Sequence, residues 1–216
     1  MIHLITTCAK SKNKDGIKPV VLQTDASLQA VQQRWNSSLQ ERLSSSSGMP
    51  VISLYRGAHW STAIDILRHT PDLQLWVISA GLGFLHYDDR AIPYEATFNT
   101  LPFSSSAWWL ALNAMTGITR RCRDISTLMH RYPDDCFLIA GSPVYLAAIE
   151  DDVCHGVSAL HNVASQLTVI TSQAYSGILT PFVTYSHAGM LGELGANMVT
   201  LNIRLARQVI QTLTHV

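Results

Sequence analysis

Apolar and polar positions alternate along the chain in two patterns, and each pattern predicts one kind of element. Short runs rich in β-branched and aromatic residues predict buried strands. Such runs occur at residues 2–6, 49–55, 73–80, 136–140, 167–172 and 181–186. Apolar residues spaced three and four apart predict helices. This spacing occurs at 28–43, at 59–69, at 106–132, from Pro143 onward and in the last part of the chain, from about residue 193.

The alternation of predicted strands and helices is typical of an α/β sheet with several parallel neighbours. We therefore expect one α/β domain over residues 1–216, with a mixed, mostly parallel sheet flanked by helices. The stretch 81–106 shows no clear period, and a loop of that length inside a compact domain is usually functional. In sheets of this class, ligands bind beyond the carboxyl ends of the strands.

The composition argues against two classes of protein: those that bind nucleic acid through a large basic excess, and those that span a membrane. The 216 residues are 47% hydrophobic and 14% charged, and fifteen basic residues balance fifteen acidic ones. Domains that hold nucleic acid by bulk charge usually have a basic excess, so only a local basic groove is compatible with such a partner. The N-terminus has no signal-peptide pattern, and no apolar run approaches the ~18 residues that span a bilayer. We expect a cytoplasmic protein with reduced thiols and no membrane contact.

The sequence gives no indication of a metal or a cofactor. The four cysteines have no CxxC spacing, and the nine histidines form no HExxH pattern. The GLG at 81–83 lacks the third glycine of a dinucleotide-binding fingerprint. We therefore expect neither a metal nor a cofactor.

Four segments that follow predicted strands are expected to meet at the carboxyl edge of the sheet. They are residues 8–12, 79–83, 141–143 and 186–189. Their small residues let the backbone approach a ligand closely. Cys8 then stands at the ligand-binding edge, next to Lys10 and Lys12, and a positive field favours the thiolate form. A buried, inert cysteine with solvated lysines is the alternative.

Further candidates lie in the long loop. Asp88 and Asp89 could act as general acid and base, although a polar turn explains them as well. The aromatic side chains near them could stack on a planar base, or could anchor the loop to the core. The candidate binding residues are Ser11, Lys12, Ser79, Gly81, Gly83, Pro93, Tyr94, Phe98, Gly141, Ser142 and His187.

Two segments resemble the YaaA-like proteins. They are TTCAKSK at 6–12 and WVISAGLGFLHYDDRAIPYEATF at 76–98, and the resemblance covers about a fifth of the chain. That family is associated with DNA binding and peroxide stress. A related architecture occurs in the catalytic domain of archaeosine synthase, which acts on the nitrile of 7-cyano-7-deazaguanine in tRNA. Size and loop pattern are most similar to the DpdC-type members of bacterial systems that place 7-deazaguanines in DNA.

The resemblance implies a substrate and a role for each candidate. Cys8 would attack the nitrile of 7-cyano-7-deazaguanine in DNA to give a thioimidate, which water converts to the carboxamide. Lys10 or Lys12 would keep the thiol ionised or contact phosphate, and Asp88 or Asp89 would move protons. Backbone N–H groups at 79–83 or 141–142 would hold the developing charge. DNA and other proteins of a DNA-modification cluster are the implied partners.

Two other functions remain open at this point. One is a non-catalytic DNA-binding protein of the YaaA-like kind, for which Cys8 is dispensable. The other is a base-excising or base-exchanging enzyme that uses Asp88 or Asp89 on a glycosidic bond. The chain departs from the family in two ways: no helix–hairpin–helix-type insertion is found, and only the CxxSK core of the archaeosine synthase motif is present.

Overall fold

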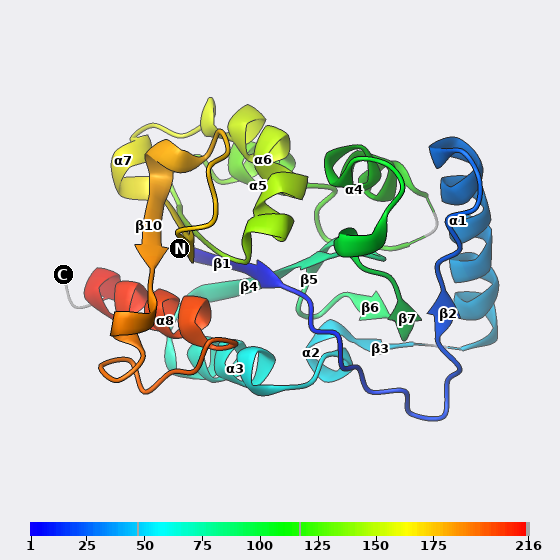
Figure 1. Cartoon of the computed structure of the whole chain (residues 1–216), viewed down its shortest axis with the longest axis horizontal. Helices are drawn as coiled ribbons and strands as arrows, with labels where there is room; N and C mark the ends of the chain where they lie inside the picture. Colours follow the sequence, from blue (N-terminus) through cyan, green and yellow to red (C-terminus); the bar gives the residue numbers. More distant parts are fainter. Residues whose placement is uncertain (47, 117, 215–216) are drawn as a thin grey trace.

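A central sheet organises the computed structural model, which describes residues 1–46, 48–116 and 118–214 (Figure 1). The strand order is β10-β9-β8-β1-β4-β5, and every neighbouring pair is parallel except β4 and β5. The expected mixed, mostly parallel sheet is confirmed. Its strands are β1 (Ile2–Thr7), β4 (Leu73–Ser79), β5 (Gly83–His86), β8 (Cys136–Ala140), β9 (Leu167–Ser172) and β10 (Val183–Ser186).

Strand β1 occupies the middle of the sheet. Its first residue, Ile2, lies opposite Leu73 of β4 on one side and Cys136 of β8 on the other. Leu4 and Ile5 have no exposed surface. Strands covered on both faces have apolar residues at successive positions, which explains why the sequence of β1 is a continuous apolar run.

Helices cover both faces of the sheet (Figure 1). In this view α5 and α6 lie above the sheet with α4 beside them, α3 and α8 lie below it, and α1 stands at one end. The bounds are α1 (Leu28–Ser45), α2 (Val51–Leu54), α3 (Ala58–His69), α4 (Ser105–Ala114), α5 (Ile125–Arg131), α6 (Pro143–Val157), α7 (Val163–Gln166) and α8 (Leu201–Thr214).

Helix α1 follows directly from its sequence. The hydroxyl of Ser27 caps the helix by accepting a hydrogen bond from the Ala30 N–H at 3.4 Å. Val31, Trp35 and Leu39 are four residues apart and form the buried face. The Trp35 indole also donates to the backbone carbonyl of residue 81, which ties α1 to the turn after β4.

Several expected elements are corrected. Residues 49–55 are not one strand: β3 (Met49–Pro50) leads into α2, because Pro50 stands at the helix N-cap and helical backbone follows it. The single helix expected over 106–132 is two helices, α4 and α5, joined by a connection that includes residue 117, which lies outside the described residues. The terminal helix begins at Leu201, and residues 215–216 are not described.

The stretch 81–106 is ordered by short pairings rather than by one long element. β6 (Arg90–Ala91) pairs with β3, and β7 (Tyr94–Glu95) pairs in parallel with β2 (Val20–Val21). Brief 3₁₀ turns follow at η1 (Phe98–Thr100), and later at η2 (Thr180–Phe182) and η3 (Ala188–Met190). Among the described helices, none combines the length and apolar character needed to cross a membrane.

Candidate active site at the end of strand β1

Cys8 is the first residue beyond β1 and lies at the carboxyl edge of the sheet. Its backbone N–H donates to the Ile78 carbonyl of β4 at 3.0 Å, which fixes where the chain leaves the sheet. The side chain is half-buried. Because β4 and β8 are parallel neighbours of β1, their carboxyl ends lie on either side of Cys8. Ligands in this class of fold bind beyond the carboxyl ends of the strands, and the thiol lies there.

The thiol has a phenol partner. The Cys8 sulfur is 3.1 Å from the hydroxyl oxygen of Tyr145, which belongs to the first turn of α6. That helix begins at Pro143, a residue suited to the first helical position because it has no N–H to leave unsatisfied. The Tyr145 ring packs edge-on against Phe98, with centroids 5.1 Å apart. Burial, and then the negative charge of a Cys8 thiolate, raises the pKa of Tyr145, so its hydroxyl stays protonated and able to donate.

A lysine lies beside the thiol in the same segment. The Lys12 ammonium is 4.2 Å from the ring centroid of Tyr94 and donates to the backbone carbonyl of Lys10 at 3.2 Å. Burial lowers the pKa of Lys12, and the charges of Cys8 and Glu95 oppose that change. The cation is thus positioned between a sulfur nucleophile and a carboxylate.

A buried chain of hydroxyls begins at Tyr94, the ring that Lys12 contacts. The Tyr94 hydroxyl is 2.9 Å from that of Tyr55 and 2.7 Å from that of Ser79. The Ser79 hydroxyl also accepts from the Leu82 N–H at 2.9 Å. Burial, followed by the Cys8 charge, raises the pKa of both tyrosines, so the chain is neutral at ordinary pH. A satisfied polar network of this kind makes the region around Tyr94 rigid.

One cavity of this site, which we call the main cavity, opens beside Cys8, Lys12 and Tyr145. Its volume is about 690 Å³, within the range of small-molecule sites. Charged groups of both signs face it, which suits a reaction that moves protons. The lining residues are Cys8, Ala9, Lys10, Lys12, Leu22, Thr24, Glu95, Ala96, Thr97, Asn99, Thr100, Leu101 and Tyr145.

A second cavity also borders residues 8–10. Its volume is about 300 Å³, and it is lined by Thr7, Cys8, Ala9, Lys10, Ser11, Arg56, Gly57, Ala58, His59 and Val199. The Thr6 hydroxyl donates to the Ala140 carbonyl at 3.0 Å and lies 2.8 Å from Nε2 of His59. Since that hydroxyl has only one proton, Nε2 carries the proton in this arrangement. Burial lowers the pKa of His59.

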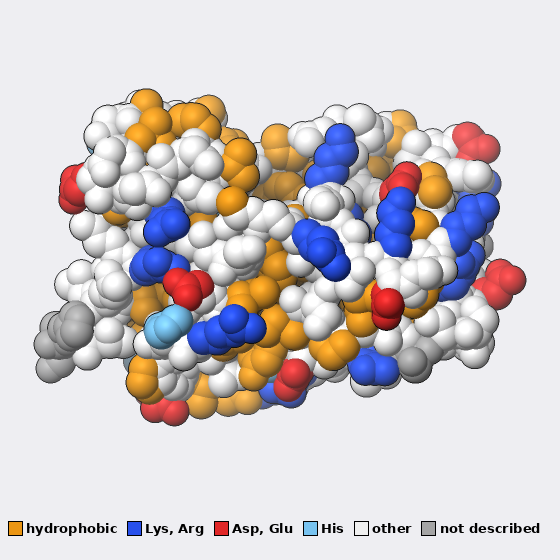
Figure 2. Space-filling model, turned by 90° about the horizontal axis from the view of Figure 1, so that it is seen from below, with side chains coloured by type: hydrophobic (Ala, Val, Ile, Leu, Met, Phe, Trp, Pro, Cys, Tyr) orange, Lys and Arg blue, Asp and Glu red, His pale blue; other side chains and the backbone are white. Residues whose placement is uncertain are grey.

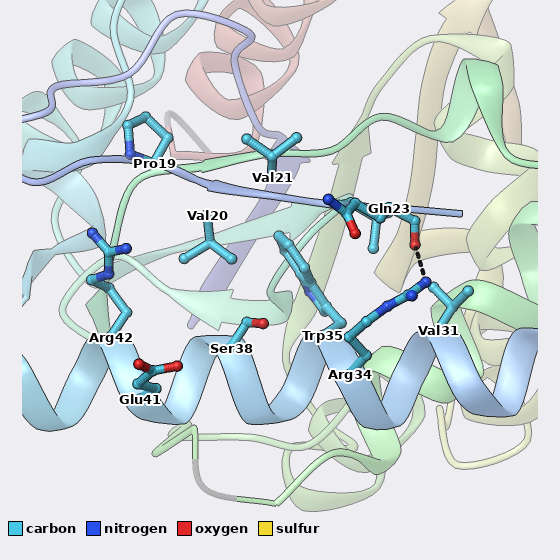
Figure 3. A pocket seen from close by; sticks show the side chains of 11 residues that line it. Pro19, Val20, Val21, Gln23, Val31, Arg34, Trp35, Ser38, Glu41 and Arg42 are labelled. Carbon is cyan, nitrogen blue, oxygen red and sulfur yellow. Dashed lines mark hydrogen bonds between the residues drawn. The ribbon is translucent and has the colours of Figure 1, made fainter. Parts of the chain in front are cut away.

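Another cavity, of about 300 Å³, lies between β2 and α1 (Figure 3). Figure 3 shows Arg34 and Arg42 reaching up from the helix; Arg34 donates to the Gln23 carbonyl and Arg42 to the Lys18 carbonyl. Both arginines are therefore engaged by the protein itself. None of the described residues that line this cavity belongs to the set predicted from sequence, and we assign it no chemistry.

The structure does not bring Asp88 and Asp89 to Cys8, which corrects their expected acid–base role. β5 runs antiparallel to β4, so the chain has turned back toward the amino end of β4 before it reaches these residues. Asp89 accepts hydrogen bonds from the backbone N–H groups of His86 and Arg121. Asp88 pairs with the Arg121 guanidinium at 3.7 Å. Both carboxylates hold the loop after β5 in place.

The expected aromatic wall is also corrected, because its rings belong to the core. Tyr94 is 1% exposed and Phe98 is 5% exposed, while Pro93 is buried beside them. The close approach at Gly81 serves packing: a Cβ there would lie 2.4 Å from the Tyr94 ring. Gly83 has a φ of +78°, which the turn into β5 requires.

The backbone groups expected to hold negative charge are largely occupied. The Gly141 N–H donates to the Ile170 carbonyl at 3.1 Å, and its carbonyl accepts from Asn202. The Gly81 N–H faces the Ser79 hydroxyl at 3.4 Å. Ser142 is exposed at the start of α6, and its side chain makes no cap. These segments shape the site more than they bind a ligand.

His187 lies away from the thiol. It follows β10, the outermost strand, and β9 and β8 stand between it and β1. Its side chain is exposed. In contrast, Lys10, Ser11 and Lys12 remain beside Cys8 around the two cavities.

Four residues around the thiol are absent from the sequence-based set: Tyr145, Glu95, Tyr55 and His59. Two of them had a signal. Tyr145 lies two residues beyond the segment 141–143, which was expected at the carboxyl edge, and Glu95 directly follows Tyr94 in the family-like motif. Tyr55 belongs to the stretch 49–55, which was expected to be a strand. His59 is the first residue of the helix expected over 59–69, which α3 confirms, and no local pattern marked it as part of a site.

No cluster of three or more His, Cys, Asp or Glu side chains suited to a metal is found in the described part of the chain. All four cysteines are unpaired. Comparisons of the chain with family models, with curated proteins and with solved structures find no match.

Proposed function

We propose that the chain is a cysteine-dependent enzyme that hydrates the nitrile of 7-cyano-7-deazaguanine in DNA to the carboxamide. The resemblance of its two motifs to the YaaA-like family, and to the DpdC-type members in particular, suggests the substrate. One observation carries the proposal: the Cys8 sulfur is 3.1 Å from the Tyr145 hydroxyl, in the wall of a cavity of about 690 Å³ that Lys12 and Glu95 also line.

In the first step, the Cys8 sulfur attacks the nitrile carbon and forms a C–S bond. One electron pair of the triple bond moves to the nitrogen, which takes a proton, so the thiol adds across the nitrile and gives a thioimidate. Tyr145 is the group best placed to relay that proton: its hydroxyl contacts the sulfur, so it takes the thiol proton as it gives its own to the nitrogen. Lys12 supports the charge that develops beside it.

In the second step, water attacks the thioimidate carbon. Glu95 is the carboxylate of the cavity, and it takes the proton of the attacking water in place of Asp88 or Asp89. Glu95 passes that proton to the imine nitrogen, which becomes the NH2 group. The tetrahedral intermediate then expels the Cys8 sulfur, the sulfur takes the proton of the intermediate's hydroxyl, and the carboxamide remains. The net change is the addition of one water.

The proposed contact with DNA is small. Figure 2 shows Lys and Arg side chains scattered over one face of the molecule, with hydrophobic and acidic side chains between them, rather than gathered in one stripe. The chain has no net charge. Binding would therefore be local and weak, with the modified base taken into the cavity. A reducing, cytoplasmic setting and partners from a DNA-modification cluster belong to the same proposal.

Nucleoside mass spectrometry tests the proposal. DNA containing 7-cyano-7-deazaguanine is incubated with the wild-type chain and digested, and the modified nucleoside is expected to gain one water. Cys8→Ser should abolish the gain. Glu95→Gln should slow it by about 100-fold, as expected for loss of a general base, whereas Asp88→Asn, the matched control, should keep the wild-type rate.

The alternatives make different predictions in the same assay. Release of the free base from DNA would indicate an excising enzyme. An unchanged cyano base with a folded protein, and equal DNA binding by wild type and Cys8→Ser, would indicate a non-catalytic DNA-binding protein. Either result would overturn nitrile hydration.

A further inference from the structure

The second cavity beside Cys8 differs in charge from the main one. Its volume is about 300 Å³, and Lys10, Arg56 and His59 line it. No acidic side chain is among the described residues of its wall, whereas Glu95 faces the main cavity. Cys8, Ala9 and Lys10 line both cavities, so the two cavities adjoin at the thiol-bearing segment.

The cavity has two exposed cations, Lys10 and Arg56. Within the described residues, no carboxylate pairs with Arg56 or Lys10. By comparison, Arg34, Arg121, Arg123 and Arg207 are each paired with an aspartate. The Arg56 backbone is nevertheless fixed, because its N–H donates to the Ser11 carbonyl at 3.0 Å. The backbone of Arg56 is thus held beside the cavity, and no carboxylate of the described residues pairs with its guanidinium.

The wall behind these cations is built and polar. His59 is fixed by its 2.8 Å contact with the buried Thr6 hydroxyl, and Ser11 adds a hydroxyl to the lining. Gly57 has a φ of +108°, so the chain can turn here from Arg56 into α3 without a side chain in the way. A planar guanidinium and an ammonium around a small polar cavity match a phosphate group in both charge and geometry.

We propose that this second cavity binds a phosphate group of the nucleotide whose base occupies the main cavity. The inference rests on the proposed function and extends it, because it makes the substrate class a nucleotide rather than a free base. Because Cys8 lines both cavities, a phosphate in the second cavity and a base in the main cavity would each lie beside the thiol. The phosphate can be a diester within a DNA strand or the monoester of a free nucleotide.

The rate at which iodoacetamide alkylates Cys8 tests the site without any turnover. The rate is measured by peptide mass spectrometry, with Cys154, a half-buried thiol of α6 outside both cavities, as the internal reference. The probes are inorganic phosphate, deoxyguanosine, deoxyguanosine 5′-monophosphate and a single-stranded oligodeoxynucleotide. We expect the probes that carry phosphate to slow alkylation of Cys8 and not of Cys154.

Arg56→Gln should raise the half-protecting concentration of deoxyguanosine 5′-monophosphate about tenfold, the loss expected for one charge-assisted contact. Arg68→Gln, at the other end of α3 and exposed, is the matched control and should leave it unchanged. Stronger protection by the oligonucleotide than by the mononucleotide identifies a diester, and the reverse identifies a monoester.

Equal protection by deoxyguanosine and its monophosphate, or an unchanged half-protecting concentration in Arg56→Gln, would overturn the phosphate site. These results are independent of nitrile hydration. If phosphate protects Cys8 but no hydration occurs, the phosphate site stands and the proposed function is wrong. If hydration occurs and Arg56→Gln does not change its rate on any substrate, the proposed function stands and the phosphate site is wrong.

Discussion

The Tyr145 hydroxyl is the atom on which the residue-scale account depends most. It contacts the Cys8 sulfur from α6, whereas the thiol itself comes from the end of β1. The two residues are 137 positions apart in the chain, and only the parallel arrangement of β1 and β8 brings them together. The proposed proton donor is therefore brought to the thiol only by the fold, while the proposed nucleophile is visible in the sequence.

Replacing Tyr145 with Phe removes that hydroxyl and keeps the ring that packs on Phe98. We expect hydration to slow by about 100-fold, the usual contribution of a positioned acid, with thermal stability close to that of the wild type. Tyr132→Phe is the control, because Tyr132 is 38% exposed at the end of α5 and lies outside both cavities. Equal initial rates for wild type and Tyr145→Phe would remove Tyr145 from the mechanism.

Some of the candidate site residues could be predicted from the sequence alone, and others could not. Cys8, Lys10 and Lys12 lie in one short segment after an apolar strand, so a local pattern was enough to find them. Tyr94 was found by the same motif but was given the wrong role, since exposure to a ligand depends on packing that no local pattern contains. It is buried against Gly81, under Lys12.

At the scale of elements, the β4–β5 hairpin decides which carboxylate belongs to the site. The glycines at 81 and 83, between two apolar runs, are a hairpin signal that the sequence-based interpretation did not use. Because β5 turns back beside β4, Asp88 and Asp89 leave the carboxyl edge, and the chain returns to it only at β7. Glu95 is then the carboxylate of the main cavity.

The hairpin also predicts a clear effect on stability. Gly81→Ala would place a Cβ 2.4 Å from a carbon of the Tyr94 ring, in a buried and rigid part of the core. We expect the free energy of unfolding to fall by about 1–3 kcal/mol, as for other overpacked core sites. Urea denaturation measures it. Gly192→Ala is the control, because a Cβ there meets nothing within 4 Å; a similar loss in both variants would contradict the packing argument.

At the scale of the whole molecule, the sheet topology was the part most accessible to sequence. Strands β1, β4, β8 and β9 are continuous apolar runs because they are covered on both faces, and such runs are easy to recognise. The break between α4 and α5 was missed because apolar residues continue at near-helical spacing through the connection, where Met115, Ile118 and Cys122 are buried although they are not helical.

Buried histidine couples the stability of the molecule to pH. Burial first, then the charges of Arg121 and His3, lowers the pKa of His86 to about 3. The unfolded chain binds this proton below its ordinary value of 6.5, while the folded chain does not until about pH 3. Folding stability from this group is therefore complete above pH 6.5 and is lost as the pH falls from there toward 3.

Denaturation at a series of pH values measures this effect. We expect the free energy of unfolding to fall by up to about 1.4 kcal/mol per pH unit through His86, an upper limit because the neighbouring Arg121 is exposed. In His86→Gln, the free energy of unfolding should depend less on pH between about pH 6 and 4 than it does in the wild type. His155→Gln, an exposed histidine at the end of α6, should not. A wild-type slope in His86→Gln would show that other groups cause the acid sensitivity.

The central claim is that Cys8 forms a covalent bond to the nitrile carbon, and intact-protein mass spectrometry tests it most directly. The Glu95→Gln variant, in which the attack of water is slowed, is incubated with the 7-cyano-7-deazaguanine nucleotide and denatured in acid. Because the thiol adds across the nitrile without a leaving group, the expected mass equals that of the protein plus the whole nucleotide. Peptide mapping should locate the adduct on Cys8. The Cys8→Ala, Glu95→Gln double variant should form no adduct. An adduct on another residue, or the same adduct in the variant without Cys8, would contradict it.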